Sequence, residues 1–287
     1  MSASESPRVN LHTHTCRCKH GTGTVADYCR EAVKADISIL GFTDHCPFPD
    51  GEYGDSRMDF AEMPDYIREI EQARLEFPQL TILSGLELDY RPILGKQFFV
   101  DEFIDKYSLD YVIAGAHHLP AANGRPYLHA AWENPMSLPT LHGFVRESIR
   151  VMELGMIEFL AHPDLTACSI PCWTPEVRSA YLDIIDAAAA LNIPLEINAY
   201  GLRKKWIDTP EGCRPMYPWR RFWELVAEHG GITVVACSDA HRAEDVWGNL
   251  DDAFQLAGEC GLTVENDRIA RQIISRRNGI APAQPNP

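Results

Sequence analysis

Short apolar runs alternate with amphipathic stretches along most of the chain. Each run is apolar at consecutive positions, which is typical of strands that are buried on both faces of a parallel sheet. Seven such strands are predicted, at residues 8–12, 37–43, 81–86, 110–115, 157–161, 194–198 and 232–237.

Between these runs, apolar residues recur at the spacing of an amphipathic helix. The first stretch opens with Thr24-x-x-Asp27, which is close to a capping box. Helices are predicted at residues 24–35, 64–76, 98–106, 138–153, 175–191, 219–229, 251–260 and 266–277. This alternation predicts a single α/β domain. The expected boundaries are a flexible N-terminus at residues 1–7, the domain at 8–277 and a disordered tail at 278–287.

A single α/β domain of this kind is either an open doubly wound sheet or a closed barrel. No Gly-x-Gly-x-x-Gly motif follows the first strand, and the chain has no Walker-type loop. Both observations argue against a nucleotide-binding sheet.

Composition narrows the possible partners. The chain has 26 Lys and Arg against 41 Asp and Glu, which gives a formal net charge of −15 and argues against long nucleic acid or an anionic membrane. No apolar run approaches the ~20 residues of a membrane span, and the N-terminus lacks the pattern of a secretory signal. Nine cysteines show no disulfide-type spacing. We therefore expect a cytoplasmic protein.

Polar residues of the metal-binding type recur where the predicted strands end. In a parallel barrel these ends meet on one rim, where active sites lie. A lone histidine at such a place is more often a core residue, and we interpret His142 and His229 in that way. His129 is expected in a loop, where it is solvated. The repetition from strand to strand instead predicts a metal site. The candidate ligands are His12, His14, His20, His45, Glu87, His117, His162, Asp239 and His241.

Nine ligands are too many for a single zinc ion, which uses three or four protein side chains. The number suits three metal ions, with Glu87 as the obvious bridging carboxylate. Mixed imidazole and carboxylate ligands suit Zn, Fe and Mn alike. Cys16 and Cys18 lie within the same stretch of sequence, and whether either touches a metal is left open.

As a set, these motifs resemble the polymerase-and-histidinol-phosphatase (PHP) family of metal-dependent phosphoesterases. The resemblance runs from about residue 9 to about residue 250. It implies a distorted (β/α)7 barrel with a trinuclear metal site at the C-terminal ends of the strands. The implied ligand sets are His12, His14, Glu87 and Asp239; His20, His45 and His241; and Glu87, His117 and His162.

Residues 196–204, Glu-Ile-Asn-Ala-Tyr-Gly-Leu-Arg-Lys, are similar to a segment of histidinol-phosphate phosphatases within that family. Arg203 is then predicted to clamp the phosphate, because a guanidinium matches phosphate oxygens. His118 is a candidate for contacting the substrate and protonating the leaving oxygen. Asp44 and Asp164 are expected to orient ligand histidines. The stretch after His117 departs from the family pattern, so the substrate alcohol is less certain than the chemistry.

The predicted function is hydrolysis of a small phosphomonoester, with L-histidinol phosphate as the leading substrate, by a metal-bound hydroxide at a trinuclear site. Residues 46–63 could cover the pocket and supply an acidic wall for the cationic alcohol. The alternatives are another phosphomonoester or a nucleotide, an amidohydrolase-like reaction, and metal binding without catalysis. An amidohydrolase would typically use a bridging lysine, and no Lys stands at a predicted strand end. Oligomeric state is not readable from the sequence.

Overall fold

The structure is a computed structural model, and it describes residues 7–119, 128–129 and 133–279. The flexible ends predicted at 1–7 and 278–287 lie outside the described residues, apart from residues 7, 278 and 279.

The strands form two parallel sheets. Four of them pair in chain order, each with the next, and two later strands pair with each other. The first sheet consists of β1 (Arg8–Asn10), β2 (Ile37–Phe42), β3 (Thr81–Leu88) and β4 (Tyr111–Ala114), and the second of β7 (Leu195–Asn198) and β10 (Val234–Cys237).

Isolated bridges link the two sheets. Leu160 pairs in parallel with Ala114 at the end of β4 and with Leu195 at the start of β7. On the other side, Thr13 after β1 pairs with Ala240 after β10. An α/β fold with a curled parallel sheet is therefore confirmed. The strand predicted at 157–161 is reduced to this single bridging residue, so its apolar run reflects burial rather than an extended ladder.

The helices follow the predicted pattern closely. Three predicted helices have the predicted bounds, and the capping box of α1 is formed by Thr24 and Asp27. The stretch predicted at 98–106 instead divides into a short α-helix and a π-helix at Val100–Asp105. The α-helices are α1 (Val25–Lys34), α2 (Met63–Glu76), α3 (Gly95–Phe99), α4 (Leu138–Glu153), α5 (Pro175–Leu191), α6 (Tyr200–Arg203), α7 (Arg220–His229), α8 (Leu250–Glu259) and α9 (Asn266–Arg277).

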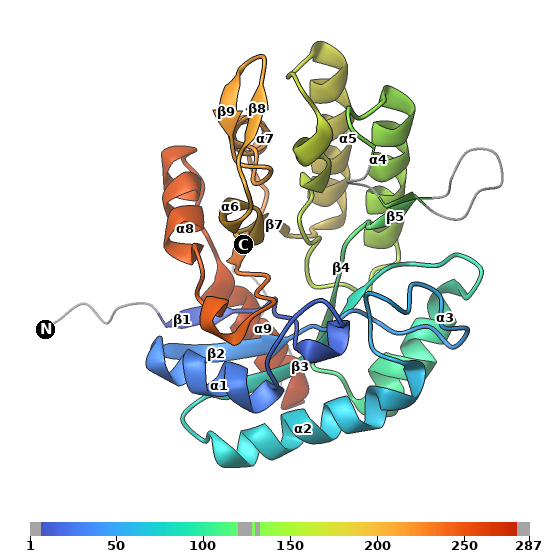
Figure 1. The fold of residues 1–287 in the computed structure, drawn as a ribbon, viewed down its shortest axis with the longest axis vertical. Helices are drawn as coiled ribbons and strands as arrows, with labels where there is room; N and C mark the ends of the chain where they lie inside the picture. The colour runs from blue at the N-terminus through green and yellow to red at the C-terminus, as the bar shows by residue number, and fades with distance from the viewer. Residues whose placement is uncertain (1–6, 120–127, 130–132, 280–287) are drawn as a thin grey trace, which may run out of the picture.

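The helices cover the outside of the strands. Helices α1 and α2 pack against β2 and β3, whereas α4 and α5 stand side by side in a separate layer (Figure 1). Two short antiparallel hairpins were not predicted: β5 (His118–Leu119) with β6 (Leu128–His129), and β8 (Ile207–Thr209) with β9 (Gly212–Arg214). Short 3-10 helices lie at Cys16–Cys18, Phe60–Glu62, Leu165–Ser169 and Ala243–Asp245.

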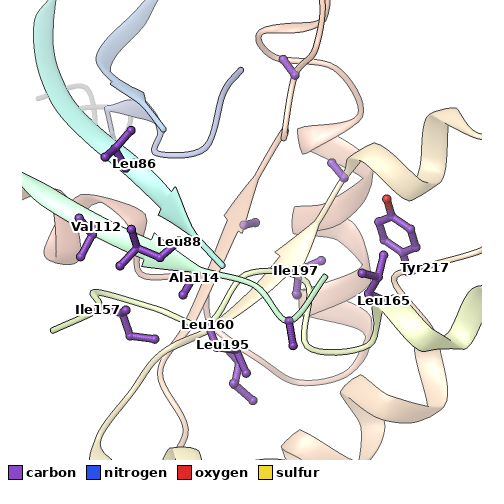
Figure 2. Close-up of a cluster of buried hydrophobic side chains, with 14 of the residues drawn as sticks. Leu86, Leu88, Val112, Ala114, Ile157, Leu160, Leu165, Leu195, Ile197 and Tyr217 are labelled. Atoms are coloured by element: carbon purple, nitrogen blue, oxygen red, sulfur yellow. The ribbon is translucent and has the colours of Figure 1, made fainter. Parts of the chain in front are cut away.

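Two apolar clusters hold these layers together. One joins alternate residues of both sheets, including Val9, Ile39 and Val235, with Ile269 and Ile273 of α9, as expected for residues that share one face of each strand. The other packs the strands against the helices. Figure 2 shows its side chains from β3, β4 and β7 gathered around Leu160. Among the described residues, no helix is both long and apolar enough to cross a membrane.

One glycine is required by this packing. A Cβ built on Gly41 of β2 would lie 2.0 Å from the hydroxyl oxygen of Tyr111, and that hydroxyl donates a 2.7 Å hydrogen bond to the carbonyl of Leu11. The absent side chain therefore lets Tyr111 reach across from β4 to the segment after β1.

Candidate metal centre

A cavity of about 560 Å³ opens where the strands end. Seven of the nine predicted ligands line it, and His12 and His14 are fully buried. The ligands that line the cavity are His20, His45, Glu87, His117, His162, Asp239 and His241. Segments that are far apart in the sequence thus deliver imidazoles and carboxylates to one place.

The first group surrounds two facing imidazoles. Nε2 of His12 lies 3.0 Å from Nε2 of His14. Glu87 Oε2 lies 3.5 and 3.4 Å from these two nitrogens, and Asp239 Oδ1 lies 3.6 and 3.2 Å from them. Two nitrogens and two carboxylate oxygens therefore converge on one point.

The second group uses the other oxygen of Glu87. Glu87 Oε1 lies 2.9 Å from Nε2 of His162 and 3.4 Å from Nε2 of His117. The two imidazole nitrogens are 3.1 Å apart. Glu87 thus presents one oxygen to each of two ligand groups, which is the geometry that a bridging carboxylate needs.

The third group lies nearer the surface. Nε2 of His20 is 2.9 Å from Nε2 of His241, and His14, His45 and His241 offer ligand atoms within 4.8 Å of one another. The thiol of Cys18 lies within the same reach of His20 and His241, whereas Cys16 is exposed. Burial raises the pKa of the Cys18 thiol to about 12, so this sulfur is neutral at pH 7 when no metal is bound.

The donor atoms fit divalent metal ions. Two nitrogens bound to one tetrahedral zinc at 2.0–2.1 Å lie roughly 3.3 Å apart, close to the spacing in each imidazole pair. Glu87 Oε2 and Asp239 Oδ1 are buried and accept no hydrogen bond of normal geometry from any described residue. Buried acceptors without donors are costly, and a shared cation would satisfy both.

Electrostatics favour the same interpretation. Burial lowers the pKa of His241 to about 3, so its imidazole is neutral and can offer a lone pair. Burial opposes the ionisation of Glu87, but the surrounding imidazoles hold the pKa of this carboxyl well below its usual range. Burial by itself lowers the pKa of His14, but the carboxylates of Asp239 and Glu87 outweigh it and raise this pKa to about 9. These carboxylates favour a positive charge at His14, and a bound metal ion would take the place of the proton there.

Two carboxylates that the sequence interpretation did not assign hold the ligands in place. Glu196 accepts a 2.7 Å hydrogen bond from Nδ1 of His12 and a 2.9 Å hydrogen bond from the backbone nitrogen of His162. Asp89 accepts from Nδ1 of His117 at 3.0 Å. A carboxylate on the second ring nitrogen fixes the tautomer and orientation of a metal-binding histidine.

The residues expected in that role do something else. The carboxylate of Asp44 accepts hydrogen bonds from the backbone nitrogen and hydroxyl of Thr15, at 3.0 and 2.9 Å. Asp164 accepts from the backbone nitrogen of Trp219. Both carboxylates therefore order backbone segments next to the site, and their hydrogen bonds go to groups other than the ligand imidazoles.

The backbone is bent at two ligands. His162 and Asp239 have φ angles of +31° and +47°, a region that costs about 1–3 kcal/mol for a residue with a side chain. Close to them, a Cβ on Gly115 would lie 2.3 Å from Cε1 of His162 and 2.9 Å from Cε1 of His117. Gly115 therefore leaves the space in which the two imidazoles approach each other.

Of the two neighbouring basic residues Arg203 and Lys204, Lys204 lines the cavity, whereas Arg203 was the predicted one. The guanidinium of Arg203 donates hydrogen bonds to the backbone carbonyls of Ser238 and Gly248. Lys204 lines the cavity, with its Nζ 4.3 Å from the centre of the Tyr200 ring. Arg203 is absent from the lining formed by the described residues, because its donors are directed at the chain around Asp239. His118 does line the cavity, and its ring stacks on Tyr53 at 3.7 Å.

Comparison with known proteins identifies the family to which this arrangement belongs. The family model described as the PHP domain matches residues 10–199. This chain belongs to the PHP family. It is 31% identical to a Deinococcus radiodurans protein named "Probable histidinol-phosphatase", covering 87% of this chain and 92% of that protein. It is 36% identical to the histidinol-phosphatase of Bacillus subtilis, covering 85% and 96%.

The fold is also that of a solved PHP structure. The chain matches the histidinol phosphate phosphatase of Lactococcus lactis, crystallised with zinc, L-histidinol and phosphate, with a TM-score of 0.68. The match covers 90% of this chain and 95% of the other at 20% identity. At that identity the similarity establishes the shared fold.

Proposed function

We propose that this PHP-family chain is a metal-dependent phosphatase that hydrolyses L-histidinol phosphate to L-histidinol and phosphate. One observation carries the proposal: nine side chains of the metal-binding type converge in three groups at one cavity, and Glu87 belongs to two of the groups. Seven of the nine line the cavity, and His12 and His14 are buried. The names of the relatives that are 31% and 36% identical support phosphatase chemistry on this particular substrate.

In this proposal the ligands hold three divalent ions. His12, His14, Glu87 and Asp239 form one set, Glu87, His117 and His162 a second, and His20, His45 and His241 a third. When bound, Zn, Fe or Mn ions polarise phosphoryl oxygens and lower the pKa of coordinated water towards ~7. Glu196 and Asp89 keep His12 and His117 in the orientation that metal binding requires.

Lys204 is proposed to attract and orient the phosphate, the role predicted for Arg203. Its ammonium lies at the cavity wall beside the rings of Tyr200 and Tyr217, at 4.3 and 5.8 Å. Arg203 instead holds the chain at Ser238 and Gly248. It is therefore proposed to fix the segment that carries Asp239.

We expect Lys204→Ala to raise KM for a phosphomonoester about tenfold, since about 1.4 kcal/mol of binding corresponds to that factor. Its metal content should not change. Lys205→Ala is the matched control, because Lys205 follows directly in the chain but lines a different pocket. The measurement is KM from steady-state kinetics of both variants, with the metal content of each determined alongside. Equal KM values for the two variants would remove Lys204 from the phosphate site.

The organic part of the substrate would lie against the segment after β2. Tyr53, Asp55 and His118 line the same cavity as Lys204. The carboxylate of Asp55 suits the amine of histidinol, and the stacked rings of Tyr53 and His118 offer an aromatic surface next to it.

The substrate is tested by comparing histidinol phosphate with an aryl phosphate and a phosphodiester, using metal-loaded protein. We expect phosphate release from histidinol phosphate to have the highest kcat/KM of the three. A faster reaction with the diester would contradict the proposal and favour a different PHP-type phosphoesterase.

A further inference from the structure

Arg57 is a large cation in an unusual place. It lies in the segment that connects β2 with α2, and only 1% of its surface is exposed. A buried charge is costly unless it is paired and hydrogen-bonded. Its guanidinium donates to the carbonyl of Cys46 at 2.7 Å and to Asp89 Oδ2 at 2.9 Å. The guanidinium also lies over the rings of Phe48 and Tyr53, at 4.7 and 5.3 Å.

The partner of this cation contacts a proposed metal ligand. Asp89 Oδ1 accepts from both the backbone nitrogen and Nδ1 of His117, at 3.1 and 3.0 Å. Asp89 Oδ2 faces Arg57 and, at 3.4 Å, Nδ1 of His118. The two oxygens of one carboxylate therefore divide between the ligand His117 on one side and the wall of the cavity on the other.

The segment between β2 and α2 also forms part of the cavity wall. Tyr53 stacks on His118 and lies within reach of the Arg57 guanidinium, and all three residues line the cavity. A shift of this segment would move Arg57, and Asp89 would then lose the partner that fixes its second oxygen. The carboxylate could rotate, and the hydrogen bond that orients His117 would weaken.

We infer that Arg57 is a positioning residue that, through Asp89, couples the cavity wall formed by Tyr53 and His118 to the metal ligand His117. This inference rests on the proposed metal centre. Arg57 acts on the metal without contacting it, by fixing the carboxylate that fixes the imidazole.

Arg91 provides a matched control, because it also anchors the segment between β2 and α2. Arg91 holds the same segment from outside, with Nη1 donating to both oxygens of Asp50 at 2.8 and 2.9 Å. Its guanidinium lies over Phe48 at 4.8 Å, nearly the same distance as the 4.7 Å of Arg57. Arg91 donates to Asp50 rather than to Asp89, so loss of Arg91 loosens the segment without removing a partner from Asp89.

The test is zinc affinity, measured by competition with a chromogenic chelator on metal-depleted protein. We expect Arg57→Met to weaken the affinity of one bound zinc by about 10–100-fold, the usual effect of removing a residue that orients a ligand. Arg91→Met should bind zinc as the wild type does. In the Asp89→Asn background, Arg57→Met should cause no further loss of zinc affinity, since both substitutions break the same link from Arg57 through Asp89 to His117.

Circular dichroism of each variant checks folding. If Arg57→Met does not fold, Arg57→Lys replaces it in the same cycle, because a lysine keeps the charge but cannot bond the Cys46 carbonyl and Asp89 as a fork. Three results would each overturn the inference. The first is wild-type zinc affinity in the Arg57 variant, and the second is an equal loss of affinity in Arg91→Met. The third is a further loss of affinity when the Arg57 substitution is added to Asp89→Asn. A wild-type protein that binds no zinc would instead overturn the proposed function.

Discussion

The two halves of the curled sheet hold their proposed ligands by different means. In the first half, β1 to β4 each pair with the next strand, and no candidate ligand of this half has a positive φ. In the second half, β7 and β10 pair with each other and are joined to the first half by single bridging residues, and His162 and Asp239 are the two candidate ligands with positive φ. Where single bridges stand in place of a β-ladder, polar side chains add further links.

These links form a buried network. Glu196 holds His162, and Asn198 donates to both Glu196 and Asp239, at 2.9 and 3.0 Å. Arg203 holds the carbonyl of Ser238. Because each bond fixes one ligand segment, single substitutions here should affect metal binding more than substitution of a first-half carboxylate whose hydrogen bonds avoid the ligand imidazoles, such as Asp44.

The largest expected effect is that of Glu196→Gln. An amide at this position places a donor against either Nδ1 of His12 or the backbone nitrogen of His162, so one ligand loses its orientation. We expect metal affinity to fall about 10–100-fold or more, measured by chelator competition. Asp44→Asn is the matched control in the first half, since that carboxylate is also buried but bonds Thr15. An equal loss of metal affinity in Asp44→Asn would contradict the proposed difference between the two halves.

Gly115→Ala tests the junction between the halves. The new methyl group would overlap His162 and His117, and overpacking of this kind costs about 1–3 kcal/mol. Because the strain falls on the imidazoles, we expect the variant to lose about one metal ion per chain by elemental analysis. The thermal midpoint of the metal-free protein should fall by only a few degrees, because about 1 kcal/mol shifts it by roughly 2–4 °C and the imidazoles can move aside when no metal holds them. Full metal content would show that the two imidazoles can move apart without consequence.

Asn266→Ala probes the side chain that joins β10 to β1. The Asn266 amide accepts from the nitrogen of Ala236 at 2.8 Å and donates to the carbonyls of Ala236 and Val9, at 2.6 and 2.9 Å. Leaving these groups unpaired should destabilise the protein by about 3 kcal/mol, measured by urea unfolding. Ser84→Ala in the first half should cost about 1 kcal/mol or less, because the ladder of β3 remains. Similar costs would contradict the difference between the halves.

The smallest effect is expected from Thr24→Ala in the capping box of α1. Loss of this cap should cost about 1 kcal/mol of unfolding free energy without changing metal content. Hydrogen bonds from Thr24 lower the pKa of Asp27 to about 2. The stabilising contribution of the ionised carboxylate is therefore present above about pH 4 and is lost as the pH falls towards 2. The difference between the variant and the wild type in urea unfolding should shrink over that range.

The same division explains what the sequence could predict. Consecutive apolar residues predicted β2 and β3 well because these strands are mostly buried and each pairs with a strand on either side. The run at 157–161 looked the same, but only Leu160 pairs. Pairing depends on where the neighbouring strands end, and local composition does not record this.

The candidate ligands were predicted because they follow strands, whereas the residues that support them were missed. Asp89 stands two residues after Glu87, and Asn198 two after Glu196, so each pair shares one side of a strand. This spacing was a usable signal for both supports. The choice between Arg203 and Lys204 was not readable, because one step along a helical turn rotates a side chain by about 100°.

The central claim is that the ligands gathered around Glu87 hold the metals on which phosphatase activity depends. The direct measurement is hydrolysis of histidinol phosphate by protein shown by elemental analysis to be metal-free, followed by titration with Zn, Fe or Mn. We predict no activity without metal and recovery that is complete at about three equivalents. Hydrolysis by the metal-free protein at the rate of the reconstituted protein would contradict the account.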